Sequence, residues 1–254
     1  MCQVHTLHKM IWLRSLLFFI CLIIYTPIYA MFCLVTFPFL NQSARYRVIQ
    51  FWCKSIIYFL ELFCQVRFQV IGQEHIDAVI DQPVIILSKH QSAWETIAFL
   101  QIFPKELCFV FKRELLWIPF FGWVIALLNM IHINRADKSA SGISVANQGK
   151  DRLKAGKWII LFPEGTRTPV GSHKPYRKGG ARLASLTSAT VLPVAHNAGH
   201  CWPRNSFMKY PGLITVSIGP AISSIGKSGD ELHNEVENWI EEEMRRIDPG
   251  AYQR

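Results

Sequence analysis

The run from Ser15 to Leu40 constrains this chain more than any other part of its sequence, because it contains no charged side chain. Built as one helix, the run would be about 39 Å long at 1.5 Å per residue, and it would exceed the roughly 30 Å hydrocarbon core of a bilayer. Two prolines, Pro27 and Pro38, interrupt it. A kinked span, a re-entrant hairpin and a helix lying in the interface are therefore all compatible with this run.

The basic residues on either side of this run predict its orientation. Lys9 and Arg14 precede it, whereas four basic residues follow it, namely Arg45, Arg47, Lys54 and Arg67. Because the more basic flank stays on the cytoplasmic side, we expect the body of the protein to face the cytoplasm. A signal peptide cleaved after Ala30 is the alternative, but the apolar run continues well past that point.

Residues 44–66 predict a second helix, rich in aromatic side chains and basic at its edges. This pattern is typical of a helix at a bilayer surface, and an ordinary core helix of the globular body is the alternative. We therefore expect two parts: membrane-anchoring or interfacial helices at 1–66 and an α/β domain at 67–254.

The composition indicates what the chain contacts. Half of its residues are hydrophobic and only 18% are charged, below the roughly 25% usual in soluble domains. The net charge is +9, and acidic residues are concentrated after residue 228, so the rest of the chain is more basic still. A basic and apolar body suits an anionic membrane surface or a phosphate-bearing ligand. No block of Lys and Arg interleaved with aromatic residues occurs, so nucleic acid is not an expected partner.

Short apolar runs alternate with helical windows beyond residue 67. This alternation predicts an α/β fold, with a largely parallel or mixed sheet flanked by helices. The expected strands are 84–87, 107–111, 130–133, 158–162, 190–195 and 214–218, and the expected helices are 94–102, 119–128, 139–155, 179–188 and 229–247. The last window is amphipathic and acidic, and we expect it to cover the sheet without a chemical role.

A histidine and a glutamate follow the expected strand at 84–87. Ligands bind at the carboxyl ends of strands in α/β sheets, and His90 would lie in the turn there, with Glu95 in the first turn of the next helix. One hypothesis is that Glu95 holds one ring nitrogen of His90, so that the other nitrogen can accept a proton. The structural alternative is that Ser92 and Glu95 form a capping box, which needs no function. The two are compatible.

A second group of polar residues follows the strand at 158–162. Gly165 and Thr166 can offer backbone N–H groups, and Arg167 has a guanidinium fork that matches a phosphate. The alternative for Arg167 is a surface ion pair. Two further basic residues, Lys112 and Arg135, also stand at the ends of expected strands.

Other kinds of site find no support in the sequence. There is no Gly-x-Ser-x-Gly elbow, no P-loop and no dinucleotide-binding fingerprint. His196 and His200 are four residues apart, but Asn197 to Gly199 between them disfavour a helix, so we expect no metal site. The seven cysteines show no ligand spacing and predict buried thiols in a reducing compartment.

In this order, the segments resemble the motifs of the glycerolipid acyltransferase family, most closely its bacterial lysophosphatidic acid acyltransferases. The family's His-x4-Asp motif corresponds to His90 and Glu95, and its second motif to the segment from Lys112 to Gly122. Its third motif corresponds to 162–167 and its fourth to 191–194. Glu95 stands where most members carry Asp, and His-x4-Glu also occurs in the late acyltransferases of lipid A.

The resemblance implies an enzyme that moves a fatty acyl group from a thioester, acyl-CoA or acyl carrier protein, onto the sn-2 hydroxyl of lysophosphatidic acid. His90 would be the general base and Glu95 its orienting partner. Binding of the substrate, and of its phosphate in particular, would fall to Lys112, Arg135, Glu164, Gly165, Thr166 and Arg167. The resemblance implies no bound cofactor or metal.

It further implies a bacterial inner membrane location, with the catalytic domain facing the cytoplasm. Three alternatives stay open at this point: an acyltransferase for another lysolipid or a lipid A type acceptor, a non-catalytic membrane lipid-binding protein, and a hydrolase that uses the same histidine with water.

Overall fold

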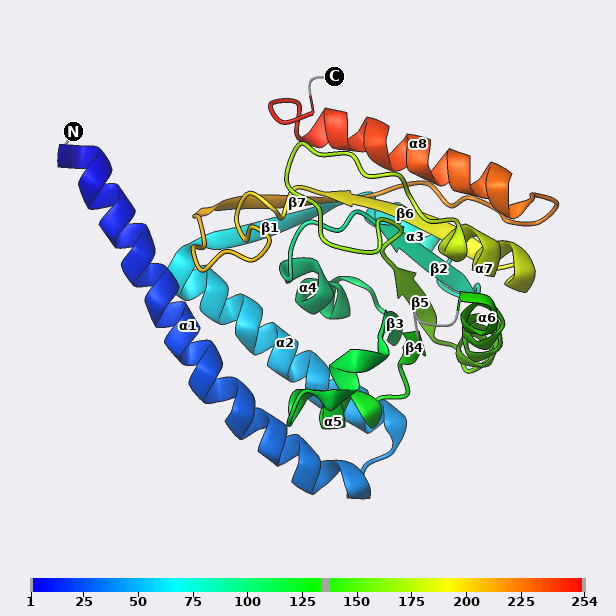
Figure 1. Ribbon diagram of the computed structural model, residues 1–254, viewed down its shortest axis with the longest axis horizontal. Helices are drawn as coiled ribbons and strands as arrows, with labels where there is room; N and C mark the ends of the chain where they lie inside the picture. Colours follow the sequence, from blue (N-terminus) through cyan, green and yellow to red (C-terminus); the bar gives the residue numbers. More distant parts are fainter. Residues whose placement is uncertain (1, 134–137, 253–254) are drawn as a thin grey trace.

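The computed structural model describes residues 2–133 and 138–252. A seven-stranded sheet forms its centre, in the order β1-β7-β6-β2-β5-β3-β4 (Figure 1). All neighbouring strands are parallel except β6 and β7, which are antiparallel. The sheet is therefore mixed and flanked by helices, as the sequence predicts. The strands are β1 (Val66–Ile71), β2 (Val84–Ser88), β3 (Leu107–Lys112), β4 (Ile131–Ile133), β5 (Trp158–Leu161), β6 (Thr190–His196) and β7 (Gly212–Ile218).

Helices cover both faces of this sheet (Figure 1). On one face lie α1 (Cys2–Thr36), α2 (Gln42–Cys64) and α4 (Trp94–Ile102), and on the other α6 (Lys138–Lys154), α7 (Gly179–Thr187) and α8 (Gly229–Ile247). Shorter elements are η1 (Phe37–Phe39), α3 (Gln73–Asp77), η2 (Arg113–Trp117) and α5 (Phe121–Ala126). Strand β1 was not predicted, although its sequence VRFQVI largely alternates apolar and polar residues, the pattern of a half-buried edge strand.

The apolar run forms a single long helix that packs along the body. Pro27 lies inside α1, whereas Pro38 falls in η1, where the chain turns back into α2. Phe18 joins the core beneath the sheet, and the Ser15 hydroxyl accepts a hydrogen bond from the Lys209 backbone N–H at 2.9 Å. Residues Thr6–Phe39 form a helical stretch that is long and apolar enough to cross a membrane.

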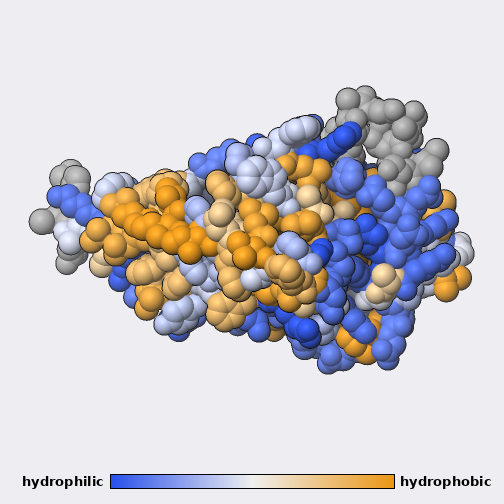
Figure 2. All heavy atoms as spheres, turned by 90° about the horizontal axis from the view of Figure 1, so that it is seen from below, coloured by the Kyte–Doolittle hydropathy of each residue, from blue (hydrophilic) through white to orange (hydrophobic). Residues whose placement is uncertain are grey.

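Much of α1 nevertheless faces outward with apolar side chains. Figure 2 shows them gathered on the face seen from below, over the part of the molecule where α1 lies. The large apolar residues that are exposed on α1 include Leu13, Leu17, Ile20, Ile24, Ile28, Met31 and Val35. Trp117 and Ile118 of the segment leading into α5 are exposed as well. Continuous apolar surface of this kind marks an interaction site.

Helix α2 packs in the core along one face, and the interpretation of a helix at a bilayer surface stays a prediction. Ile56 and Leu60 are fully buried in the core beneath the sheet. Phe51, Tyr58 and Leu62 are more than half exposed on its other side. It is therefore a core helix along one face, while its other face is apolar and open.

Candidate active site

The site is built where β2 ends and α4 begins. The His90 Nδ1 atom lies 2.7 Å from Glu95 Oε1. His90 precedes α4, which starts at Trp94, so the chain turns between the two residues and their side chains can meet. The His90 ring stacks on Phe162, with 4.0 Å between ring centroids. The imidazole is thus held on its face by Phe162 and at Nδ1 by Glu95.

Glu95 does two things at once. Its Oε1 atom accepts the backbone N–H of Ser92 at 2.9 Å and that of Gln91 at 3.1 Å, besides the contact with His90. The Ser92 hydroxyl accepts the N–H of Trp94 at 3.1 Å. The predicted capping box is only half formed: Glu95 accepts the Ser92 N–H, but the N-cap of α4 is Ala93, and the Ser92 hydroxyl accepts the N–H of Trp94 rather than that of Glu95. The same carboxylate oxygen serves this half of the box and the contact with His90.

The charge on Glu95 is supported by its surroundings. Burial opposes its ionisation, but the hydrogen bond with His90 and the N–H of Ser92 lower the pKa of Glu95 below its ordinary value. Its place in the first turn of α4 also favours a negative charge. Since a carboxylate can only accept, Nδ1 of His90 must carry the proton, and Nε2 is then the basic nitrogen. Within the described part of the chain, no hydrogen-bond partner contacts Nε2.

Sequence reasoning missed the role of His196. This residue is fully buried at the end of β6, and its Nε2 lies 2.8 Å from the Lys89 carbonyl oxygen and 4.0 Å from Glu95 Oε1. Its Nδ1 accepts the N–H of Ala198 at 3.3 Å. Burial lowers the pKa of His196, which fits a neutral ring that holds the Lys89 backbone. Because β6 runs parallel to β2, the carboxyl ends of both strands lie at the same edge of the sheet. The position of His196 at the end of β6 could therefore have indicated that it lies near His90.

The turn at 163–168 lies directly against His90. The backbone N–H of Thr168 donates to the His90 carbonyl oxygen at 2.8 Å. Glu164 is fully buried, and its Oε2 accepts the His90 N–H at 2.6 Å, while Oε1 accepts the Thr168 hydroxyl at 3.0 Å. Glu164 was expected to bind substrate, but both of its oxygens are engaged by the protein, so it holds the His90 turn instead.

Gly165 requires a second correction. It has φ +69°, and an added Cβ would lie 2.9 Å from Arg177 Nε, so glycine suits this position for conformational and steric reasons. The N–H of Gly165 donates to the Phe162 carbonyl oxygen at 2.9 Å. The expectation that this N–H faces an anion is therefore wrong, because it closes the turn. Thr166 N–H has no partner in the described part of the chain.

Two of the predicted basic residues, Lys112 and Arg167, follow or end adjacent parallel strands, β3 and β5. Arg167 is partly buried, and its guanidinium makes no ion pair with any residue that the structure describes. Lys112 is the last residue of β3, which is parallel to β5 and adjacent to it. Arg135 lies outside the described residues. Arg167 lies in the same turn as Thr168, whose N–H donates to the His90 carbonyl oxygen.

Comparison with known proteins agrees with this arrangement. Residues 67–197 match the model of a protein family described as acyltransferase. The chain belongs to this acyltransferase family. It is 42% identical over 241 residues to a 1-acyl-sn-glycerol-3-phosphate acyltransferase of Pseudomonas aeruginosa, covering 93% of this chain and 92% of the relative.

More distant members share the same region. A 1-acyl-sn-glycerol-3-phosphate acyltransferase beta of Homo sapiens is 27% identical, over 73% of this chain and 65% of its own. The crystal structure of a 1-acyl-sn-glycerophosphate acyltransferase, PlsC, from Thermotoga maritima superposes with a TM-score of 0.75 at 27% identity. That match covers 97% of this chain and 98% of the other, so α1 and α2 are included in it.

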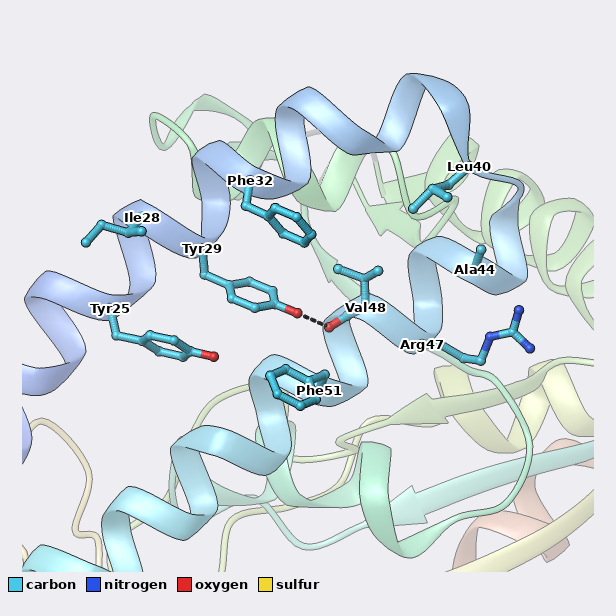
Figure 3. A pocket seen from close by; sticks show the side chains of 9 residues that line it. All are labelled: Tyr25, Ile28, Tyr29, Phe32, Leu40, Ala44, Arg47, Val48 and Phe51. Carbon is cyan, nitrogen blue, oxygen red and sulfur yellow. Dashed lines mark hydrogen bonds between the residues drawn. The ribbon is translucent and has the colours of Figure 1, made fainter.

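Two hollows lie among the helices rather than at His90. A groove of about 750 Å³ separates α1 from α2, with aromatic side chains along it and Arg47 at its rim (Figure 3). A smaller pocket of about 170 Å³ is almost wholly apolar, and Pro119 and Phe120 of the second motif form part of its wall, together with α1, α2 and α5. None of the predicted site residues lines either hollow. Both are suited to hydrocarbon rather than to charged groups.

Proposed function

We propose that this acyltransferase transfers a fatty acyl group from an acyl thioester, acyl-CoA or acyl carrier protein, to the sn-2 hydroxyl of lysophosphatidic acid, giving phosphatidic acid. The observation that carries the proposal is the pair of His90 and Glu95, with Nδ1 and Oε1 2.7 Å apart. The 1-acyl-sn-glycerol-3-phosphate acyltransferase of Pseudomonas aeruginosa, similar along nearly the whole chain, supports the choice of acceptor.

In the proposed reaction, His90 is the general base. Its Nε2 takes the proton of the sn-2 hydroxyl, and the oxygen attacks the carbonyl carbon of the thioester, forming the C–O bond. The charge on Glu95 stabilises the imidazolium that forms. The C–S bond then breaks, and the proton passes from His90 to the departing sulfur. The products are phosphatidic acid and a free thiol, and no acyl-enzyme is needed.

The substrate phosphate is assigned to the basic residues at this edge. Arg167 is the leading candidate, because its guanidinium has no partner in the described part of the chain and lies on the turn that touches His90. The open N–H of Thr166 can add a hydrogen bond to the same anion. Lys112 and Arg135 stay predictions for this role.

Replacing Arg167 by Ala should lower kcat/KM for lysophosphatidic acid by about 10–150-fold, since a hydrogen bond to a charged group contributes roughly 1.5–3 kcal/mol. Arg167→Lys should restore only part of the lost kcat/KM, because lysine lacks the two-pronged guanidinium group. The measurement compares lysophosphatidic acid with monoacylglycerol as acceptors. Monoacylglycerol has no phosphate, so activity toward it should fall little. Arg182, exposed on α7, provides a matched Arg→Ala control. Equal losses with both acceptors would mean that Arg167 does not hold the phosphate.

We also propose that the enzyme works at the bacterial inner membrane from the cytoplasmic side, with the apolar face of α1 in the bilayer. Support comes from Ile24 and Ile28, which are 58% and 65% exposed on that face. A lipid substrate held at this surface needs no transfer through water. The apolar pocket beside Pro119 is suited to an acyl chain in the same location.

Lysine at both Ile24 and Ile28 should reduce partition onto phospholipid vesicles by roughly 10²–10⁴-fold, because burying each Ile contributes about 1.5–3 kcal/mol and every 1.4 kcal/mol is about tenfold. Both side chains are exposed in the protein, so the melting temperature should change little. Flotation of the purified variant with vesicles at high salt measures the partition. Leu186→Lys, at an equally exposed residue of α7, is the control. Undiminished flotation of the double variant would contradict the proposed surface.

One experiment tests the function as a whole. Membranes carrying the protein are supplied with lysophosphatidic acid and either acyl-CoA or acyl carrier protein thioester, and the lipid products are separated. We expect phosphatidic acid with at least one donor, which also identifies the donor. Release of free fatty acid without phosphatidic acid would identify a hydrolase, and binding without turnover would identify a lipid-binding protein. Turnover of a different acceptor alone would correct the substrate.

A further inference from the structure

The two residues that flank His90 are polar and fully buried, which the proposed reaction does not explain. Lys89 and Gln91 each have no exposed surface. Lysine is almost never fully buried unless it is paired, and the contacts of both residues extend beyond this turn. They lead to the C-terminal helix, for which the sequence predicts only a covering role.

Lys89 is paired with two carboxylates from distant parts of the chain. Its Nζ donates to Glu241 Oε1 of α8 at 2.7 Å and lies 3.0 Å from Glu164 Oε1. The Tyr176 hydroxyl donates to the same Glu241 oxygen at 2.7 Å. Burial alone would lower the pKa of Lys89, but Glu164 and Glu241 outweigh burial and raise it. Lys89 is therefore a buried cation between two anions.

Gln91 is tied to the residues that follow α8. Its Nε2 donates to the Tyr252 hydroxyl at 2.7 Å, and its Oε1 accepts the N–H of Gly199 at 3.1 Å. Figure 1 shows α8 lying across the sheet, with the following residues returning beside it. The C-terminal part of the chain thus supplies one partner on each side of His90.

These contacts reach the backbone of His90 itself. Glu164, which the Lys89 ammonium holds at 3.0 Å, accepts the His90 N–H through its other oxygen at 2.6 Å. A shift of Lys89 would therefore move the group that fixes His90. The ring would then lose its alignment with Glu95, and a displacement of about 1 Å at a reacting group can cost 10²-fold in rate.

A covering helix alone does not need this glutamate. Replacing a buried ion pair by apolar residues of similar size is often neutral or stabilising, so packing on the sheet would be served equally well by apolar residues at both 89 and 241. We propose that α8 and the residues after it form a positioning element for the reaction: Glu241, acting through Lys89 and Glu164, and Tyr252, acting through Gln91, hold the backbone of His90. This inference rests on the proposed role of His90.

The first test is Glu241→Gln in the full chain, with Glu237→Gln as its control. Glutamine keeps the shape of Glu241, and the remaining Lys89–Glu164 pair is neutral overall, so the variant should fold. We expect kcat to fall by about 10–100-fold, with KM for lysophosphatidic acid unchanged within about twofold. Glu237 lies one turn earlier on α8 and contacts only His173 and His233 in the described part, so its variant should keep the wild-type kcat.

A purely structural role would give a different pattern. The melting temperature of Glu241→Gln would fall, while kcat of the folded fraction would stay at the wild-type value, and that result would overturn the proposal. The second test is a double-mutant cycle with Lys89→Met. Because Lys89 and Glu241 act in series, the double variant should be no slower than the slower single variant. Losses that multiply would overturn the proposed chain of contacts.

Tyr252→Phe keeps the ring and removes only the hydroxyl that accepts from Gln91, so it tests the other side of the turn without disturbing a charge. It should lower kcat by about 3–10-fold at constant KM, and a wild-type kcat would remove Tyr252 from the proposal. His90→Ala separates the two levels of inference. If it stays active, the proposed function fails. If it is inactive while Glu241→Gln has the wild-type kcat, only the positioning role fails.

Discussion

Replacing His90 by Ala is expected to lower kcat for phosphatidic acid formation by about 10²–10⁴-fold, the usual loss on removal of one general base. The fold should tolerate the change, because Glu95 Oε1 keeps the N–H donors of Gln91 and Ser92, and the carboxylate is not left unpaired. The rate of product formation per folded enzyme, together with a thermal melt, measures both effects.

The control for this loss is His173→Ala. His173 is half exposed and pairs with Glu237 on the surface of the molecule, so its removal should leave the rate at the wild-type value. Retention of more than about a tenth of the wild-type rate by His90→Ala would show that His90 is not the general base.

The second large effect is expected from Glu95→Gln, for which we predict a loss of about 10²–10⁴-fold in kcat. The amide can still accept from the N–H of Ser92, but it has no charge to stabilise the imidazolium and no longer fixes the His90 tautomer. An Asp→Asn change in a serine protease triad reduces kcat by about 10⁴-fold for the same reason. A steady-state assay at pH 7 gives the value.

The stability that Glu95 contributes to the wild-type fold should depend on pH in a defined direction. The pKa of Glu95 is lower in the folded chain than its ordinary value of 4.5, so the ionised carboxylate stabilises the fold above that value. The contribution is lost as the pH falls through the folded pKa. The difference in melting temperature between wild type and Glu95→Gln should therefore narrow in acid.

A matched variant distinguishes a capping role of Glu95 from its role in orienting His90. Glu231 occupies the equivalent position of a true capping box at the start of α8, where it accepts the N–H of Ser228 at 2.7 Å. Glu231→Gln should alter stability slightly and leave the rate unchanged. If Glu95→Gln behaves in the same way, Glu95 is a capping residue only.

Much of the fold follows from local sequence. Helices α4 and α8 begin and end where the apolar periodicity predicts, at 94–102 and 229–247. The neighbours of each strand were not predictable, because the antiparallel pairing of β6 and β7 depends on how the whole chain returns across the sheet. Strand β1 has no continuous apolar run like the predicted strands, and the alternation of Arg67 and Gln69 with apolar residues, which does favour an edge strand, was overlooked.

In the site, too, contacts between residues close in sequence were predictable, and contacts with distant parts of the chain were not. The contact between His90 and Glu95 spans five residues, and the position of a strand end makes it visible in the sequence. The position of Glu164 after a strand was predicted. That its side chain points inward was not predicted, since nothing in 162–167 indicates the contact with buried Lys89. Glu241 lies 152 residues from Lys89, and a buried acid on an acidic helix has no local signature.

The stacking of Phe162 on His90 has a consequence for the order of events. With one face of the ring covered and Nδ1 held by Glu95, the imidazole cannot turn over between its two proton transfers. A single nitrogen must therefore receive the proton from the alcohol and deliver it to the sulfur. In the proposed reaction no acyl-enzyme forms, so the same nitrogen can serve both transfers only while the lysolipid and the acyl donor are bound together. We therefore expect turnover through a ternary complex, with intersecting reciprocal plots, whereas parallel plots would indicate an acyl-enzyme.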